Sequence, residues 1–223
     1  MAELPLSGAA PKDALWLIRH GDRVDFVDLD WARTALRPHD PGLSEEGVAQ
    51  ARAAASRLAG EGIARIFSSP YLRCVETAGH IARAAGVSVS LEPGLGELQH
   101  PDWGPGLADM LSARELERFA PIDEAYASRF APRPPETIAD AFARSAHAAR
   151  ALATTHEGPL LLVGHAVSIF GIVKDLTGHA GDIPCPVASL FRLDRDGGGW
   201  KVGLLADTTH LAKGAGAVLV TSG

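Results

Sequence analysis

Short apolar runs alternate with amphipathic segments along most of the chain, which is the pattern of strands alternating with helices. Six runs predict strands, at residues 14–18, 63–67, 87–91, 159–163, 187–193 and 200–205. The run at 159–163 is continuously apolar, as is typical of a strand buried on both faces of a parallel sheet. The alternation favours a layered α/β/α fold with a largely parallel central sheet.

Apolar residues at helical spacing predict helices between these strands, near 45–58, 70–85, 136–155 and 167–176. Ser44 is the expected N-cap of the first helix, because Glu45 and Glu46 follow it in the favourable first turn. Ser69 followed by Pro70 has the composition of an N-cap with proline at the first helical position. We therefore expect the second helix to begin there.

Three stretches interrupt this rhythm. Residues 1–13 are rich in Ala, Pro and Gly, and we expect a flexible leader. Residues 22–43 are polar and predict a long loop of the kind that often serves function. Residues 101–135 contain six prolines around short helical segments and predict an inserted cap rather than part of the main sheet. Residues 14–223 are then expected to form a single domain.

Composition narrows the function classes. The formal net charge of -6 argues against a broad nucleic-acid-binding surface, although a recessed arginine cluster still allows an anionic substrate. The only two cysteines, Cys74 and Cys185, fit no zinc motif and no disulfide framework. No signal peptide and no apolar run of the ~20 residues needed to cross a bilayer is evident, so we expect a cytoplasmic protein without membrane contact.

Titratable side chains follow three of the predicted strands. Arg19 and His20 follow the first strand, Arg73 opens the helix after the second, and His165 follows the fourth. Ligands of open α/β sheets bind beyond the carboxyl ends of the strands, so these distant residues are expected to meet at one edge. Alternatively, each is a solvated arginine or a histidine held by backbone, and Arg73 pairs with Glu76 or Glu92 on a helix surface.

The expected cluster has the chemistry of phosphoryl transfer. Arginine forks supply paired donors for phosphate oxygens, and an unprotonated imidazole is a nucleophile near neutral pH. A carboxylic acid in the cleft could protonate the leaving alkoxide. Two arginines, two histidines and one carboxyl would suffice without a metal or a cofactor.

Four motifs in this order resemble those of the histidine phosphatase superfamily, whose fold is that of phosphoglycerate mutase. They span about residues 14–210 and read Leu17-Ile18-Arg19-His20-Gly21, Ser68-Ser69-Pro70-Tyr71-Leu72-Arg73-Cys74-Val75-Glu76-Thr77-Ala78, Leu95-Gly96-Glu97-Leu98 and Leu162-Val163-Gly164-His165. The resemblance implies a phosphomonoesterase that works through a phosphohistidine.

The same resemblance assigns roles to individual residues. It implies that His20 is the nucleophile, that Arg19, Arg73 and His165 bind the phosphoryl oxygens, and that Glu97 is the general acid. Asp102, Glu92 and Asp109 are the nearby alternatives to Glu97.

The run from Arg19 to Asp25 adds a finer resemblance, to the phosphatase branch with the suppressor-of-T-cell-receptor-signalling phosphatase domains and ecdysteroid-phosphate phosphatase. In that branch a further arginine contacts phosphate, which implies that Arg23 binds substrate. After Glu97 the chain departs from many relatives, since Pro101-Asp102-Trp103-Gly104 keeps the tryptophan but lacks the second acid.

Three alternatives stay open. A phosphomutase would return the phosphoryl group to its substrate, but Asp22-Arg23-Val24-Asp25 replaces the Ser-x-x-Asn run usual in phosphoglycerate mutases. A metal hydrolase could use His20, His165 and a carboxylate, although no paired zinc spacing supports it. A non-catalytic module could bind phosphorylated partners. The expected substrate is a small phosphate monoester or a phosphopeptide.

Overall fold

The computed structural model describes residues 13–100 and 110–212. Its elements follow one another as β1 (Leu15–Arg19), α1 (Val24–Val27), α2 (Trp31–Thr34), α3 (Glu45–Leu58), β2 (Arg65–Ser68), α4 (Leu72–Ala85), β3 (Val89–Leu91), the 3₁₀-helix η1 (Pro93–Leu95), α5 (Ala113–Leu116), α6 (Ile138–Thr155), β4 (Leu160–Gly164), α7 (Ala166–Thr177), β5 (Leu190–Asp196) and β6 (Gly199–Asp207). All six expected strands are present, with boundaries shifted by a few residues.

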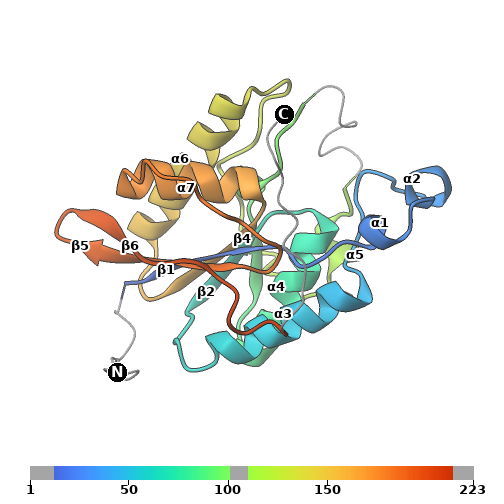
Figure 1. The fold of residues 1–223 in the computed structure, drawn as a ribbon, viewed down its shortest axis with the longest axis horizontal. Helices are drawn as coiled ribbons and strands as arrows, with labels where there is room; N and C mark the ends of the chain where they lie inside the picture. Colours follow the sequence, from blue (N-terminus) through green and yellow to red (C-terminus); the bar gives the residue numbers. More distant parts are fainter. Residues whose placement is uncertain (1–12, 101–109, 213–223) are drawn as a thin grey trace.

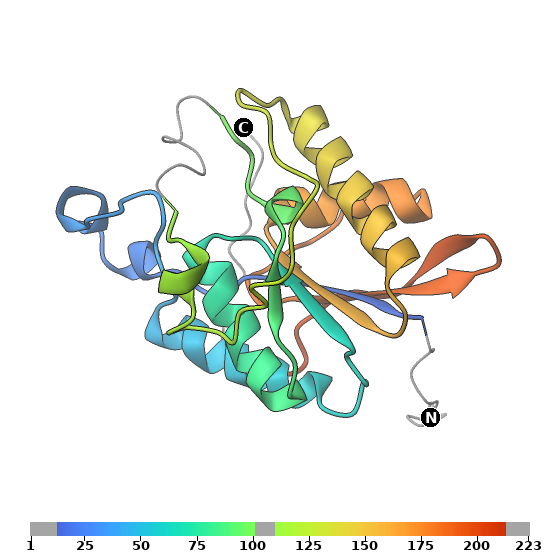
Figure 2. The ribbon, with the colours of Figure 1, turned by 180° about the vertical axis from the view of Figure 1, so that it is seen from behind.

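The strands form one sheet in the order β3-β2-β4-β1-β5-β6. The first four strands in this order are parallel, whereas β5 and β6 are antiparallel to their neighbours. Helices α3 and α4 lie on one face and α6 and α7 on the other (Figures 1 and 2). The predicted layered α/β/α fold with a largely parallel sheet is therefore confirmed.

Both faces of the sheet are buried, and β1 shows how one strand serves two cores. Trp16 and Ile18 join the apolar cluster under α3 and α4, while Leu15 and Leu17 join the cluster under α6 and α7. Successive strand side chains point to opposite faces, so a strand between two helical layers needs an apolar residue at every position. The uninterrupted apolar runs in the sequence follow from this arrangement.

The start of α4 differs from the prediction. Its N-cap is Tyr71, not Ser69, and the first helical amide, that of Leu72, donates to the buried carboxylate of Asp40 at 2.8 Å. The amide of Ser69 continues the ladder of β2 by donating to the Val163 carbonyl. The cap thus comes from a loop residue distant in sequence, which local sequence could not indicate. Ser44, by contrast, is confirmed as the N-cap of α3.

The two irregular stretches are also more ordered than predicted. Residues 22–43 contain the single-turn helices α1 and α2, which project from the body of the molecule (Figure 2). In the described part of the expected cap, 110–135, Ile122 forms a parallel bridge with Val89, so this segment touches the edge of the sheet. The remainder of the cap and nearly all of the expected leader lie outside the described residues.

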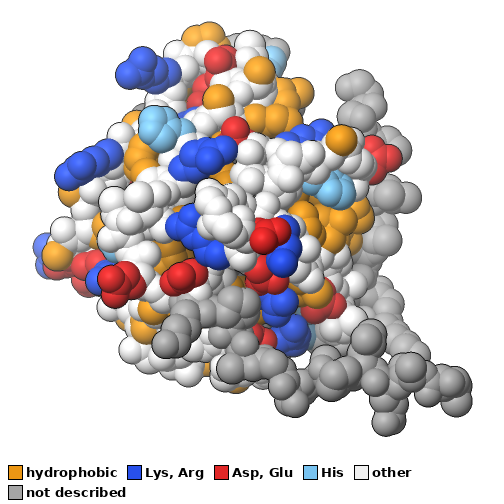
Figure 3. All heavy atoms as spheres, turned by 90° about the vertical axis from the view of Figure 1, so that its left-hand side faces the viewer, with side chains coloured by type: hydrophobic (Ala, Val, Ile, Leu, Met, Phe, Trp, Pro, Cys, Tyr) orange, Lys and Arg blue, Asp and Glu red, His pale blue; other side chains and the backbone are white. Residues whose placement is uncertain are grey.

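At the β5–β6 end of the molecule, Lys and Arg side chains are interspersed with Asp and Glu (Figure 3). Ion pairs on these strands have both signs of charge close together: Arg192 with Asp194 along β5 at 2.9 Å, and Lys201 of β6 with Asp196 of β5 at 3.9 Å. This face therefore offers no continuous basic area for a polyanion.

Candidate active site

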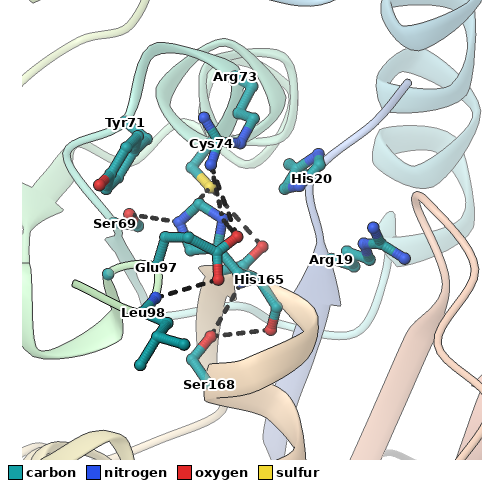
Figure 4. Close-up of polar contacts among 12 residues, drawn as sticks. Arg19, His20, Ser69, Tyr71, Arg73, Cys74, Glu97, Leu98, His165 and Ser168 are labelled. Atoms are coloured by element: carbon teal, nitrogen blue, oxygen red, sulfur yellow. Dashed lines mark hydrogen bonds and ion pairs between the residues drawn. The ribbon is translucent and has the colours of Figure 1, made fainter. Parts of the chain in front are cut away.

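The carboxyl ends of β1 and β4 lie side by side, and each is followed by a histidine. Arg19 is paired in register with Gly164, and the His20 amide donates to the Gly164 carbonyl at 3.0 Å. His165 comes next, so the ring centroids of His20 and His165 are only 5.4 Å apart. The predicted meeting of these residues at one sheet edge is thus observed (Figure 4).

His20 is buried and held in one tautomer. Its Nδ1 lies 2.8 Å from the Gly21 carbonyl oxygen, which can only accept, so Nδ1 carries the proton and Nε2 keeps its lone pair. Burial lowers the pKa of His20 well below 6.5, and electrostatic interactions with Arg73, His165 and Arg19 lower it further. The imidazole is therefore neutral, and its Nε2 is a free nucleophile near neutral pH.

The two buried arginines flank this imidazole. Arg73 lies over the ring of Tyr71, with its Cζ 4.5 Å from the ring centroid, and Arg19 donates from Nη1 to the Cys185 carbonyl at 2.5 Å. The Nε atoms of both are buried and have no hydrogen-bond partner among the described residues. Buried donors without partners are costly, so this pair is suited to an anionic ligand.

Glu97 lies opposite His20, in contact with His165 and Arg73. Its Oε2 is 3.3 Å from His165 Nδ1 and 3.7 Å from Arg73 Nη2, and its Oε1 accepts from the Leu98 amide at 3.1 Å. The Glu97 side chain is 28% exposed, whereas that of Arg73 is 3% exposed. Glu97 is thus the most exposed side chain of this cluster, whose other members are buried. Figure 4 shows its carboxylate beside His165.

The same contacts decide the charge states. Burial would raise the pKa of Glu97, but His165 and Arg73 outweigh it and hold the pKa below its usual value of 4.5. Burial lowers the pKa of His165 to about 4, with Glu97 opposing the shift and Arg73 reinforcing it. Without a ligand, the site at neutral pH holds two neutral imidazoles, two guanidinium groups and one carboxylate.

Ser69, which the sequence predicted to be a helix N-cap, is instead a residue of this site. Its Oγ lies 2.9 Å from His165 Nε2, and both side chains are buried. Ser-Pro at a helix start suggested a cap, and only its position at the end of β2, beside β4, shows that it reaches His165. Ser168 holds the backbone of the same histidine, since its Oγ accepts from the His165 amide at 2.9 Å.

Two further residues fix the loop after β1. Thr77 Oγ1 accepts from the Gly21 amide at 3.1 Å and donates to the Arg73 carbonyl at 2.7 Å, which links the loop after His20 to α4. A Cβ on Gly21 would lie 2.7 Å from the Gly47 carbonyl oxygen, so only glycine permits this approach to α3. Thr77 lies four residues after Arg73, a spacing that places both on one helix face.

Arg23 lies at the margin of the cluster. Its guanidinium forms an ion pair with Asp25 and lies 4.5 Å from the centroid of the Phe26 ring. Its charge nevertheless contributes, after burial, to lowering the pKa of Arg73. Of the six predicted site residues, Arg73, Glu97 and His165 contact one another, and His20 packs against His165. Arg19 lies beside His20, whereas Arg23 is engaged with α1.

The alternatives to Glu97 are resolved only in part. Glu92 is buried away from the histidines and accepts from Tyr126 Oη at 2.5 Å and Ser128 Oγ at 2.7 Å. Asp102 and Asp109, like Trp103, lie outside the described residues. Glu97 is the carboxylate that contacts both His165 and Arg73 in residues 13–100 and 110–212.

Two observations bear on other site types. Within the described ranges no group of three or more His, Cys, Asp or Glu side chains is arranged to hold a metal ion, and Cys74 and Cys185 are free thiols. Among those same residues no helix has the length and apolar character needed to cross a bilayer.

Sequence comparisons identify relatives along most of the chain. A model of the histidine phosphatase superfamily (branch 1) matches residues 15–208. The probable phosphoglycerate mutase GpmB of Yersinia pestis is 28% identical over 88% of this chain and 94% of its own length. The ubiquitin-associated and SH3 domain-containing protein A of Mus musculus is 28% identical over 50% of this chain. This match spans only 23% of the mouse protein.

Solved structures share the fold. The ecdysone phosphate phosphatase of Bombyx mori, in complex with tungstate, superposes with a TM-score of 0.71 at 22% identity, covering 94% of this chain and 96% of its own. A mycobacterial glucosyl-3-phosphoglycerate phosphatase gives a TM-score of 0.60 at 24% identity, covering 87% of this chain and 98% of its own. At these identities the likeness is one of fold.

Proposed function

The chain belongs to the histidine phosphatase superfamily, and on that premise we propose that it hydrolyses phosphate monoesters through a phosphohistidine on His20. The observation that carries the proposal is the state of His20. Its imidazole is buried and neutral, with Nδ1 bonded to the Gly21 carbonyl and Nε2 left free between two arginines.

In the first step, the Nε2 lone pair attacks phosphorus and the bond to the ester oxygen breaks. The electron pair leaves with that oxygen, which takes a proton from Glu97. Arg19, Arg73 and His165 hold the phosphoryl oxygens as charge redistributes, and each such donor contributes about 10²–10³ in rate. The unpaired Nε–H groups of the two arginines are suited to this task.

The proton on Glu97 must arrive with the substrate, because the Glu97 pKa is lowered in the free protein. A phosphate monoester monoanion carries one proton and has its second pKa at about 6. When phosphate binds, its oxygens pair with Arg73 and weaken the interaction of Arg73 with Glu97. They also place negative charge beside the Glu97 carboxyl, and both effects raise the pKa of that group.

In the second step, the Glu97 carboxylate takes a proton from water. The water oxygen bonds to phosphorus, the N–P bond breaks, and its electron pair returns to Nε2. Inorganic phosphate leaves together with the proton that Glu97 took from water, because the pKa of the carboxyl is lowered again in the free protein. None of these steps requires a metal ion, so we propose that activity is metal-independent.

The second candidate is a phosphomutase, which the likeness to the probable phosphoglycerate mutase favours. The two functions diverge after the phosphohistidine forms, when either water or an alcohol accepts the phosphoryl group. Release of inorganic phosphate from a monoester without added bisphosphate would support the phosphatase. Isomerisation without phosphate release would support the mutase.

Substrate class and context complete the proposal. We infer a small phosphate monoester, in line with fold relatives that include a phosphoserine phosphatase of Entamoeba histolytica, with a phosphopeptide as the alternative. Arg23, engaged with α1, is proposed to contact the substrate phosphate. We propose that residues 14–223 form one catalytic domain, because the six strands share one sheet. We also propose that the protein is cytoplasmic.

The decisive experiment is rapid-quench kinetics with ³²P-labelled monoester. Wild-type protein should accumulate an acid-labile, base-stable phosphoprotein before steady-state release, and His20→Asn should form none and turn over negligibly. His179→Asn, outside the site, is the matched control and should behave as wild type. Retained turnover in His20→Asn would contradict the mechanism, and activity lost to a chelator and restored by metal would contradict metal independence.

A further inference from the structure

Arg144, on α6, binds the backbone of the loop that carries Glu97. Its guanidinium is buried, with the side chain 8% exposed. It donates to four backbone carbonyl oxygens of the loop, those of Gly94 (2.8 Å), Gly96 (3.2 Å), Glu97 (3.2 Å) and Pro93 (3.4 Å). One side chain therefore supports the backbone over four of the five residues that end at Glu97.

Glu136 fixes Arg144 in this position. Arg144 donates from Nε to Oε1 at 2.6 Å and from Nη2 to Oε2 at 2.8 Å, a bidentate pair with a buried carboxylate. The same Oε2 accepts from the Gln99 amide at 3.2 Å, and the Glu136 amide donates to the Gln99 carbonyl at 3.0 Å. The ion pair thus holds the loop on both sides of Glu97.

The loop has little room to adopt another path. A Cβ on Gly94 would lie 2.7 Å from the Ala148 Cβ on α6, and one on Gly164 would lie 3.2 Å from the Leu95 carbonyl oxygen. The loop is therefore pressed between α6 and the end of β4, directly before His165. Buried carbonyl oxygens without a donor are costly, so the guanidinium determines which backbone conformation of the loop is stable.

We propose that Arg144 is a positioning residue for Glu97, and that it sets the efficiency of leaving-group protonation while leaving phosphate binding unchanged. This inference rests on the proposed function. The hydrogen bonds of Arg144 within the described residues are to the Glu97 loop and to Glu136, and none of them is to Arg19, His20, Arg73 or His165. A displacement of Glu97 by about 1 Å can cost about 10² in rate, and only for substrates whose leaving group needs its proton.

The test compares two substrates of similar shape, p-nitrophenyl phosphate and phenyl phosphate, in wild type, Arg144→Lys, Glu97→Gln and Arg150→Lys. Nitrophenolate leaves readily without a proton, whereas phenolate depends more on one. The measured quantity is the ratio of kcat/KM for phenyl over p-nitrophenyl phosphate. This ratio does not depend on the fraction of folded protein, so partial destabilisation does not affect it.

We expect Arg144→Lys to lower this ratio by about 10-fold and Glu97→Gln to lower it at least as far, with KM for p-nitrophenyl phosphate little changed. Lysine keeps the charge but cannot bond Glu136 in two places and four carbonyls at once. Arg150→Lys is the matched control, because Arg150 lies on the same helix and forms an exposed pair with Asp175. Its ratio should equal that of wild type.

Equal loss on both substrates in Arg144→Lys would overturn the positioning role, since a merely structural residue gives that result. An unchanged ratio in Glu97→Gln would instead overturn the acid role in the proposed function, which keeps the two failures distinct. Should Arg144→Lys not fold, Glu136→Gln tests the same device, since the amide breaks the ion pair but can still accept from Gln99. An unchanged ratio there would also overturn the inference.

Discussion

Glu97 Oε2 lies 3.3 Å from His165 Nδ1, and Arg73 Nη2 lies 3.2 Å from the same nitrogen. The imidazole nitrogen can donate to the carboxylate or accept from the guanidinium, but not both at once. The tautomer of His165 and the charge of Glu97 are therefore coupled. We expect a substitution of Arg73, a substitution of Ser69 (which contacts the other ring nitrogen) and a change of pH to act through this pair of His165 and Glu97.

The first prediction concerns the pH profile of kcat/KM for phenyl phosphate. Because the pKa of Glu97 is lowered, its carboxyl is unprotonated in the free enzyme at pH 5–8, and the substrate monoanion must supply the proton. kcat/KM should be flat below about pH 6 and fall about tenfold per unit above it. No loss near pH 6.5 on acidification is expected, since the lowered pKa keeps His20 neutral. A profile rising from pH 6 to 8 would contradict this assignment.

The second prediction concerns Arg73. Arg73→Ala should lower kcat/KM by at least about 10² for both phenyl and p-nitrophenyl phosphate, because it removes donors to the phosphoryl oxygens. Arg73→Lys should recover only part of this, since a point charge does not replace the planar fork. Steady-state kinetics with Arg52→Ala, an exposed arginine on α3, as control would measure it. Near-wild-type rates in Arg73→Ala would remove Arg73 from the phosphate site.

The third prediction concerns Ser69. Ser69→Ala removes the hydrogen bond to His165 Nε2, which should lower kcat/KM by about 5–30-fold, equivalent to about 1–2 kcal/mol. The ring ¹⁵N shifts of His165 should change at the same time, because the tautomer is no longer fixed from this side. Ser56→Ala, an exposed serine on α3, is the matched control. Unchanged ¹⁵N shifts in Ser69→Ala would show that the hydroxyl does not select the tautomer.

The fourth prediction concerns stability. The folded pKa of His165 is lowered to about 4, so between pH 6.5 and 4 the unfolded chain binds more protons at this residue than the folded protein. Its stabilising contribution is fully present above pH 6.5 and is lost as pH falls toward 4. The unfolding free energies of wild type and His165→Asn should then converge by about 1.4 kcal/mol per pH unit in this window. Denaturant titrations at pH 7.5, 6.0 and 5.0 would measure the difference, and a constant difference would contradict a buried neutral His165.

The sheet and the central cluster could be predicted because they depend on local patterns. The apolar runs determine where the strands lie, and residues directly after parallel strands must meet at one edge. Arg19, His20 and His165 come from that rule alone. Glu97 needed the family resemblance, since it lies on a loop whose position no periodicity indicates.

What could not be predicted depends on contacts between distant segments. The first amide of α4, that of Leu72, is satisfied by the carboxylate of Asp40, 32 residues away, and so Ser69 was available to His165. The engagement of Arg23 with Asp25 and Phe26 follows from the turn of α1, which the polar composition of 22–43 did not suggest. Nothing in the sequence indicated that Arg144 and Glu136 support the Glu97 loop, since they appear there only as opposite charges eight residues apart.

The unpaired Nε–H groups of Arg19 and Arg73 have a consequence for how the reaction ends. In the proposed mechanism these two groups bind phosphoryl oxygens, and inorganic phosphate carries the same oxygens as the ester from which it came. The site therefore cannot discriminate strongly against its own product, and orthophosphate should act as a competitive inhibitor. Any preference for the ester has to come from contacts between its alcohol part and residues beyond the phosphate cluster. The ambient phosphate concentration would then set the fraction of the protein that is free to bind substrate.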